Sequence, residues 1–336
     1  MTRKLYVAAP FGNYLSFPGC VSVSGSFTVR RRAGVLGRLW RAARTIRYDS
    51  RSDAWFNRMG LPSPGMAGIP RAKEGTLVSL FGFDGSEWTL LFDAARRNGH
   101  GEAELNLSCP NVEKSDDWLD GTLRAIASER NIEFIAKLPP VGYEPLGNKL
   151  FDLGIRKFHL CNTVKTERGG MSGKPLKPYS IAAINWFRGR FGREVELIGG
   201  GGISCVEDVT DYLDAGADHV SIGSMLFDPF SWRRIRRFRS VFSKWSNIMT
   251  EQYYCPNTGD RPDENEKSRV EYASDSLRAF LGRPLWLTCI GIAEREVETT
   301  IILYTRTDYH PALPEKWQGF RLEYRTFGDF SPLGPV

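Results

Sequence analysis

Short apolar runs alternate with amphipathic stretches along most of the chain, a pattern that predicts alternating strands and helices. Eight runs are expected to be strands: Leu5–Ala8, Cys20–Ser24, Leu77–Phe81, Ala103–Leu107, Glu133–Ala136, Lys157–Cys161, Val195–Ile198 and His219–Ile222. Helices are expected at Glu87–Arg97, Trp118–Ser128, Ser180–Phe191 and Val206–Asp214. This βαβα order predicts an α/β fold, a (β/α)8 TIM barrel, with an open doubly wound sheet as the alternative.

The connection between the first two expected strands is unusually short. Only about ten residues, Pro10–Gly19, join them, and they include two prolines and two glycines. A parallel crossover normally needs a dozen or more residues and usually contains a helix. We therefore expect a barrel abbreviated at its first βα unit, unless the first strand lies elsewhere.

The pattern changes after a helix expected at Trp232–Ile248. Residues 253–268 (YYCPNTGDRPDENEKS) are polar and rich in turn formers. Beyond them we expect a helix at Arg269–Phe280 and strands at Leu285–Ile292, Thr299–Tyr304 and Phe320–Tyr324. The predicted domains are a catalytic barrel at residues 1–250, a linker at 251–268, and a small α+β domain of unassigned role at 269–336.

Composition excludes several classes of protein. The 336 residues are 41% hydrophobic and 25% charged, which is typical of a globular protein. The net charge of +6 is too small to indicate a nucleic-acid partner. The six cysteines form no CxxC pair and the four histidines lack metal-ligand spacing, so we expect no metal and no disulfide framework. No signal peptide or long apolar run is evident, so we expect a cytoplasmic protein.

Two arginine-rich stretches stand out, Arg30–Arg51 and Trp232–Lys244. Basic amphipathic helices can contact an anionic membrane surface or nucleic acid, which would make the protein peripheral to the membrane. The alternative is a pair of barrel-surface helices whose apolar stripes pack on the strands. We favour this second interpretation for both stretches.

The segment Asn106–Asn111 (NLSCPN) carries the most informative chemistry. It follows an apolar strand, and the carboxyl ends of barrel strands face the active site. Carboxamides suit a planar ligand with alternating C=O and N–H groups, and the thiol of Cys109 can act as nucleophile or base. The alternative is an inert buried cysteine beside turn-forming residues.

This hexapeptide resembles the substrate loop of dihydroorotate dehydrogenases, and its cysteine matches the class 1 branch of that family. The resemblance implies that Cys109 removes a proton from dihydroorotate while a hydride passes to FMN. The segment Ile135–Pro140 (IAKLPP) resembles the KLPP of the family, which implies that Lys137 lies beside the flavin. Its ammonium would stabilise negative charge on the reduced ring, although a lysine at a strand end can also simply extend to solvent.

Further segments resemble the family in its order, over roughly residues 5–230. Phe56–Pro62 resembles INxMGLPN, Gly25–Thr28 resembles GSVT, and Gly169–Leu176 resembles GGLSGKPL. Glycine-rich loops after the seventh and eighth strands are expected to bind phosphate. The implied substrate-binding residues are Asn57, Met59, Gly60, Leu61, Asn106, Asn111, Asn162 and Thr163. The implied FMN-binding residues are Ala8, Ala9, Gly25, Ser26, Lys137, Gly173, Gly200, Gly201, Gly202, Gly223 and Ser224.

One flavin-contacting lysine of the family is missing. Class 1 enzymes carry it where this chain has Gly25, and class 2 enzymes carry theirs where it has Asn13. The function implied is still FMN-dependent oxidation of dihydroorotate to orotate in pyrimidine biosynthesis, by a homodimer that uses an acceptor such as fumarate or a quinone. The alternatives are an FMN barrel oxidoreductase acting on a related dihydropyrimidine ring and a non-catalytic flavin-binding relic.

Overall fold

The computed structural model describes residues 3–108, 117–160, 162–242, 287–293, 299–305, 316–317 and 320–326, with positions 270, 273, 274 and 277. The chain divides into two compact units, Met1–Phe187 with Phe191–Phe242, and Ser243–Val336 with Arg188–Arg190. No helix among the described residues is long and apolar enough to cross a membrane.

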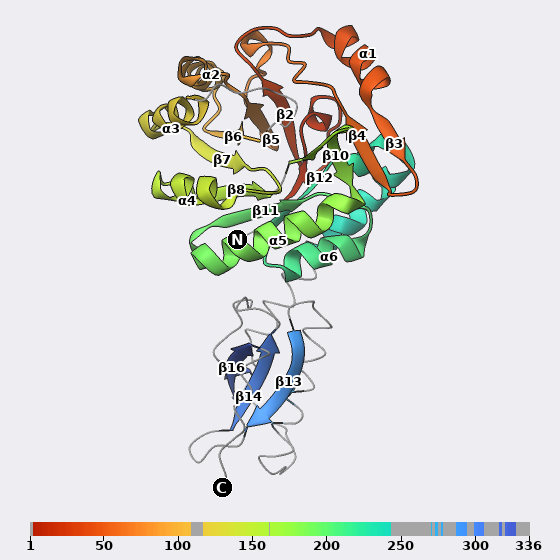
Figure 1. The fold of residues 1–336 in the computed structure, drawn as a ribbon, viewed down its shortest axis with the longest axis vertical. Helices are drawn as coiled ribbons and strands as arrows, with labels where there is room; N and C mark the ends of the chain where they lie inside the picture. The colour runs from red at the N-terminus through yellow and green to blue at the C-terminus, as the bar shows by residue number, and fades with distance from the viewer. Residues whose placement is uncertain are drawn as a thin grey trace. The chain divides into compact units, whose positions relative to one another are not determined.

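Eight parallel strands of the first unit close into a barrel in the order β1-β12-β11-β8-β7-β6-β5-β2 (Figure 1). They are β1 (Leu5–Val7), β2 (Val21–Phe27), β5 (Thr76–Leu80), β6 (Glu102–Asn106), β7 (Glu133–Lys137), β8 (Lys157–Leu160), β11 (Glu196–Gly200) and β12 (His219–Ile222). β1 pairs with both β2 and β12, which closes the barrel and excludes the open sheet. The predicted TIM barrel is thus confirmed. Its interior contains an apolar cluster of Tyr6, Val23, Leu77, Ile135 and Ile198.

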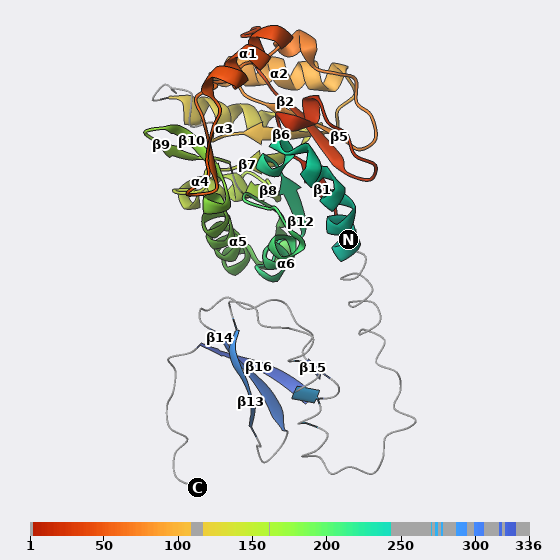
Figure 2. The ribbon, with the colours of Figure 1, turned by 90° about the vertical axis from the view of Figure 1, so that its right-hand side faces the viewer.

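Helices follow most of the strands and cover the outside of the barrel (Figures 1 and 2). They are α2 (Gly85–Arg97), α3 (Trp118–Ser128), α4 (Glu144–Asp152), α5 (Lys177–Phe191) and α6 (Val206–Asp214). Helix α4, which contains Pro145 and Gly147, was not among the expected helices. Gly147 permits close packing on α5, since a Cβ there would lie 2.6 Å from Cζ of Phe187.

The first crossover contains only the 3-10 turn η1 (Phe11–Asn13), so the absence of a helix there is confirmed. The other 3-10 turns are η2 (Met66–Gly68), η3 (Lys174–Leu176), η4 (Gly192–Glu194), η5 (Ser224–Phe227) and η6 (Pro229–Arg234).

A second sheet, which is antiparallel and not hydrogen-bonded to the barrel, has the strand order β3-β4-β10-β9. It consists of β3 (Arg47–Asp49), β4 (Ala54–Asn57), β9 (Val164–Thr166) and β10 (Gly169–Gly173). Its strands come from two insertions, one after β2 and one after β8, and Asn57 pairs with Gly170 across them. The sequence pattern did not predict this sheet, because its strands are short and its central pair, β4 with β10, joins segments more than a hundred residues apart.

The two arginine-rich stretches differ in packing. Residues 235–242 are helical, and Ile235, Phe238, Val241 and Phe242 are buried as expected. The first stretch forms α1 (Val35–Thr45), but its Leu36 is 83% exposed and its Trp40 is 61% exposed. The expectation that an apolar stripe packs on the barrel is therefore wrong at these positions.

The second unit contains a four-stranded sheet in the order β13-β14-β16-β15 (Figure 2). Its strands are β13 (Leu287–Ala293), β14 (Thr300–Thr305), β15 (Lys316–Trp317) and β16 (Phe320–Thr326), with β14 and β16 parallel. The helical positions Val270, Ala273 and Leu277 form an apolar cluster with residues of the sheet, including Ile301 and Leu303. The expected linker at 251–268 lies outside the described residues.

Candidate active site

A cavity of about 380 Å³ lies at the carboxyl ends of the barrel strands. Side chains from the ends of six barrel strands reach it, and β4, β10 and α1 add residues from outside the barrel. This volume and position are typical of a small-molecule site in a β/α barrel.

Most of the predicted site residues line this cavity. They are Ala8, Ala9, Gly25, Ser26, Asn57, Met59, Gly60, Leu61, Asn106, Lys137, Asn162, Thr163, Gly200, Gly201, Gly202, Gly223 and Ser224. Gly173 does not line it, because its backbone packs on β4, where a Cβ would lie 2.5 Å from the carbonyl oxygen of Asp53. Cys109 and Asn111 lie outside the described residues.

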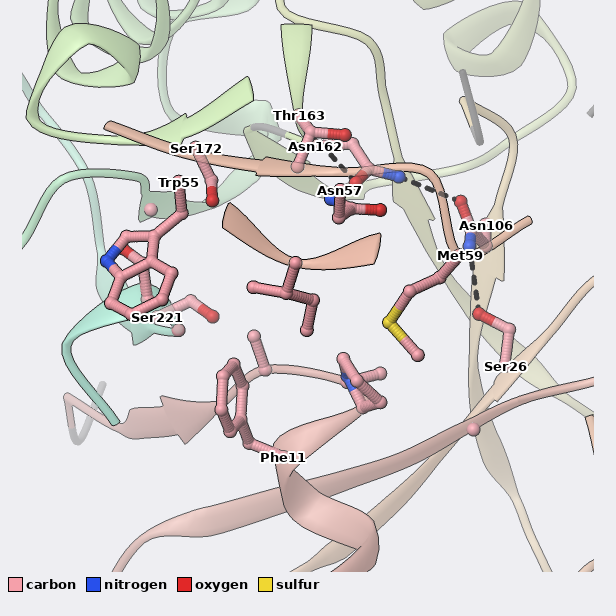
Figure 3. Close-up of a pocket in the computed structure, with 18 of the residues that line it drawn as sticks. Phe11, Ser26, Trp55, Asn57, Met59, Asn106, Asn162, Thr163, Ser172 and Ser221 are labelled. Carbon is pink, nitrogen blue, oxygen red and sulfur yellow. Dashed lines mark hydrogen bonds between the residues drawn. The ribbon is translucent and has the colours of Figure 1, made fainter. Parts of the chain in front are cut away.

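A chain of hydrogen bonds fixes the carboxamides on one side of the cavity (Figure 3). Nδ2 of Asn162 donates to Oδ1 of Asn106 over 3.0 Å, and Nδ2 of Asn106 donates to Oγ of Ser26 over 2.8 Å. The backbone N–H of Thr163 donates to Oδ1 of Asn162, and Nδ2 of Asn57 donates to the carbonyl of Gly170. Each of these bonds from a side-chain amide uses one of its two N–H groups and orients the amide. Among the described residues, the second N–H of Asn106 and of Asn162 has no acceptor and can donate to a polar ligand.

Lys137 and His159 share a buried carboxylate beneath the cavity. Nδ1 of His159 lies 2.6 Å from Oε2 of Glu104, and Nζ of Lys137 lies 3.8 Å from Oε1. Burial by itself would raise the pKa of Glu104, but the Lys137 ammonium and the contact with His159 outweigh it and lower that pKa to about 2. Burial lowers the pKa of His159, and the charge of Lys137 adds to this effect.

The imidazole of His159 is therefore neutral near pH 7, and its tautomer follows from Glu104. An ionised carboxylate can only accept a hydrogen bond, so Nδ1 of His159 carries the proton and donates it. Nε2 is left as an acceptor, and it lies near Gly200, where a Cβ would come within 3.5 Å of it. His159 thus offers an acceptor to the cavity beside the cation of Lys137.

The opposite side of the cavity is aromatic. The ring of Trp55 stacks on Phe227 with centroids 4.3 Å apart, and Phe227 meets Phe11 edge-on at 4.8 Å. Figure 3 shows Trp55 and Phe11 across the cavity from the carboxamides. A ligand with a flat apolar part and a polar edge would fit between these two walls.

The glycine loops after β11 and β12 provide backbone donors without side chains. Gly201 and Gly202 have positive φ angles of 122° and 69°, a conformation that favours glycine. Buried polar atoms without a partner among the described residues include Oγ of Ser221 and Nε of Arg38, and both residues line the cavity. A buried polar atom without a partner is costly, so a ligand that binds these groups would stabilise the site.

Comparisons with known proteins agree with this geometry. The family model described as dihydroorotate dehydrogenase matches residues 149–238. The catalytic subunit of dihydroorotate dehydrogenase B (NAD(+)) from Archaeoglobus fulgidus is 32% identical over 204 residues, which cover 51% of this chain and 67% of that protein. This chain belongs to the dihydroorotate dehydrogenase family. Its members are oxidoreductases that act on a CH–CH bond.

Other relatives share a lower sequence identity with this chain. The corresponding subunit from Thermoplasma volcanium is 29% identical over 52% of this chain and 67% of its own length. A putative dihydroorotate dehydrogenase A (fumarate) from Aeropyrum pernix is 26% identical over 50% of this chain and 64% of its own length. The ligand-free crystal structure of the Eimeria tenella enzyme superposes with a TM-score of 0.55 and 18% identity, covering 75% of this chain and 85% of that one, and shows the fold alone.

Asn13 and Gly25, the two positions at which the family resemblance led us to expect a lysine, hydrogen-bond to each other. Nδ2 of Asn13 donates to the carbonyl of Gly25, and the N–H of Gly25 donates to Oδ1 of Asn13, both over 3.0 Å. Gly25 has a φ of 126°, and a Cβ there would lie 2.4 Å from the carbonyl oxygen of Ser79. A lysine at position 25 would therefore require a different backbone conformation of β2.

Several residues that line or support the cavity were not predicted. They are His159, Trp55 and Phe227, which line the cavity, and Glu104, which contacts His159. A usable signal was present for two of them, because Glu104 and His159 interrupt apolar runs in central parallel strands, where buried charged groups need a partner. Trp55 and Phe227 come from segments without a recognisable motif and meet only in the folded protein.

Proposed function

We propose that this cavity binds FMN and dihydroorotate and that the protein oxidises dihydroorotate to orotate. The observation that carries the proposal is the convergence of Asn57, Asn106, Asn162 and Lys137 on one cavity that also has an aromatic wall. The family relationship supports the same reaction. Relatives are named for NAD(+) or fumarate, and we propose a small-molecule acceptor such as fumarate or a quinone here.

The residues that would hold FMN are those of the barrel mouth. The loops at Gly200–Gly202 and Gly223–Ser224 offer backbone N–H groups to the phosphate, as glycine loops after the last two strands do in many barrels. Lys137 places a cation beside the expected pyrimidine ring, where it would stabilise negative charge. FMN, when bound, supplies the acceptor for the hydride that leaves C6 of dihydroorotate.

Cys109 is the proposed base of the reaction. Its thiolate would take the proton from C5 of dihydroorotate, so that loss of this proton and of the hydride from C6 creates the C5–C6 double bond of orotate. Asn57, Asn106 and Asn162, with Asn111, would hold the polar edges of the ring. Since the thiolate is the active form, the rate should rise with pH through a value of roughly 8.5, or lower if the site favours the thiolate.

The direct test is Cys109→Ala in the flavin-loaded protein. We expect the yellow flavin to remain and dihydroorotate-dependent bleaching to slow by roughly 10²–10⁴-fold, the usual contribution of a general base. The pH dependence should also disappear. Stopped-flow absorbance with dihydroorotate over pH 6–10 measures both.

Cys205→Ser is the matched control. Cys205 lies at the N-terminus of α6 and does not line the cavity, and serine is a favourable residue at that position. Its rate should stay close to that of the wild type. Near-normal bleaching by Cys109→Ala would refute the role of this cysteine.

A second candidate is oxidation or reduction of a related dihydropyrimidine ring. The observation that favours it is Gly25, which replaces a flavin-contacting lysine and cannot be exchanged back without rearrangement. A panel of dihydropyrimidines in the same bleaching assay distinguishes the candidates. Faster bleaching by another ring than by dihydroorotate would identify it as the substrate.

A further inference from the structure

Helix α1 presents two opposite faces. Arg38, Ala42 and Ile46, spaced by four residues, line the cavity. Leu36 and Trp40 precede them by two positions, which is roughly 200° around an α-helix. Their side chains accordingly point away from the cavity, and they are 83% and 61% exposed. Two large apolar side chains, Leu36 and Trp40, thus lie on the outward face of this helix.

Positive charge is concentrated in the segment that contains α1. Arg30–Arg51 contains eight arginines and one acidic residue, whereas the whole chain has a net charge of only +6. Among the described residues, no arginine of α1 forms a salt bridge. The guanidinium of Arg44 instead lies over the ring of Trp40, 4.9 Å from its centroid. The outward face therefore combines two exposed apolar side chains with the guanidinium of Arg44, which forms no salt bridge among the described residues.

We propose that the outward face of α1, defined by Leu36, Trp40 and Arg44, binds an anionic phospholipid surface. Leucine and tryptophan enter the boundary between headgroups and acyl chains, while neighbouring arginines bind lipid phosphates. A protein partner fits this face less well, because two apolar side chains amid cations are too small a core for a stable protein interface. Nucleic acid would leave Leu36 without an apolar contact.

This surface would orient the molecule on the membrane. The inward residues Arg38, Ala42 and Ile46 line the cavity, so a membrane bound to the outward face of α1 lies near the cavity mouth. The binding assay needs no substrate, so its outcome is independent of the proposed reaction.

The test is flotation of the full-length protein with vesicles of phosphatidylcholine alone or mixed with phosphatidylglycerol. We expect binding to the anionic vesicles, a fall of tenfold or more when salt is raised from 50 to 500 mM, and little binding to the neutral ones. Leu36→Ser with Trp40→Ser should reduce binding at least tenfold. Arg44→Gln should reduce it several-fold, since each basic residue near an anionic surface contributes to the attraction.

The matched control is Leu90→Ser with Leu153→Ser, two exposed leucines that lie away from α1 and are 43% and 36% exposed. Both double variants should keep the circular dichroism and Tm of the wild type, because the substituted side chains are exposed. The proposal fails if the wild type does not bind anionic vesicles, or if both double variants bind equally well. Binding of duplex DNA in place of vesicles, or a self-association lost only in the α1 variant, would also overturn it.

Discussion

Glu104 is a buried carboxylate that contacts two residues of the cavity lining, Lys137 and His159. Glu104 is only 1% exposed. Its carboxylate must be ionised, because a buried Lys137 ammonium without a negative partner would destabilise the fold. The low pKa of Glu104 means that its ionised form stabilises the fold. This stabilisation is complete above the unfolded-state pKa of about 4.5 and is lost as the pH falls toward about 2. His159 also makes the fold sensitive to acid. Its pKa is lower in the folded protein than in the unfolded chain, so as the pH falls the unfolded chain binds a proton before the folded protein does and is stabilised relative to it.

We predict that Glu104→Gln lowers the free energy of unfolding at pH 7 by roughly 3 kcal/mol, because it leaves the Lys137 charge buried without a counter-ion. The difference from the wild type should shrink at pH 3, where the wild type has itself lost part of the Glu104 stabilisation. Urea denaturation at both pH values measures this. Glu133→Gln is the control, since that side chain is 60% exposed and should change stability by only about 0.5 kcal/mol. An equal loss at both pH values would contradict the assignment.

At the scale of the elements, the β4–β10 pair brings Asn57 to the cavity. Asn57 pairs with Gly170 and donates to its carbonyl, so the position of this amide depends on a close approach of two strands. Gly169 permits this approach, because a Cβ there would lie 2.3 Å from the carbonyl oxygen of Asn57. Gly169 therefore affects the site by allowing β4 and β10 to pair closely, which positions Asn57.

We predict that Gly169→Ala weakens substrate binding by roughly tenfold, which is ~1.4 kcal/mol, because it displaces Asn57. Gly154→Ala is the matched control. Gly154 also has a positive φ, 92° against 108° for Gly169, but a Cβ there would meet nothing within 4 Å. Both variants should lose about 1–3 kcal/mol of stability through backbone strain, whereas only Gly169→Ala should change KM or Kd. Equal KM values would show that Asn57 does not depend on this contact.

At the scale of the whole molecule, the cavity belongs to the first unit. Its described lining residues extend from Ala8 to Phe227, all within that unit. We propose a functional division into the barrel at 1–250, the linker at 251–268 and the small domain at 269–336. The reaction would then need the barrel alone.

We predict that cleavage at a protease site inserted within residues 251–268 leaves the flavin on the barrel fragment and changes KM by no more than about twofold. The physical reason is that no described lining residue comes from beyond position 227. Absorbance at the flavin band after size-exclusion chromatography, with steady-state kinetics, measures the result. Release of the flavin on cleavage would show that the second unit contributes to the site. The uncleaved insertion variant serves as the control.

The sequence by itself determined the order and nature of the barrel strands, because each is a local apolar run whose burial does not depend on its exact neighbours. It also placed Asn106, Asn162, Lys137 and the glycine loops at one rim, since parallel strands end on the same side of a barrel. Tertiary structure decided the rest. Three of its features join residues distant in sequence: the pairing of β4 with β10, the stacking of Trp55 on Phe227, and the contacts of Glu104 with Lys137 and His159. A fourth, the exposure of Leu36 and Trp40, depends on which face of α1 is covered. Local hydrophobic periodicity carries no information on such contacts, because it records that a side chain is apolar and not what lies against it.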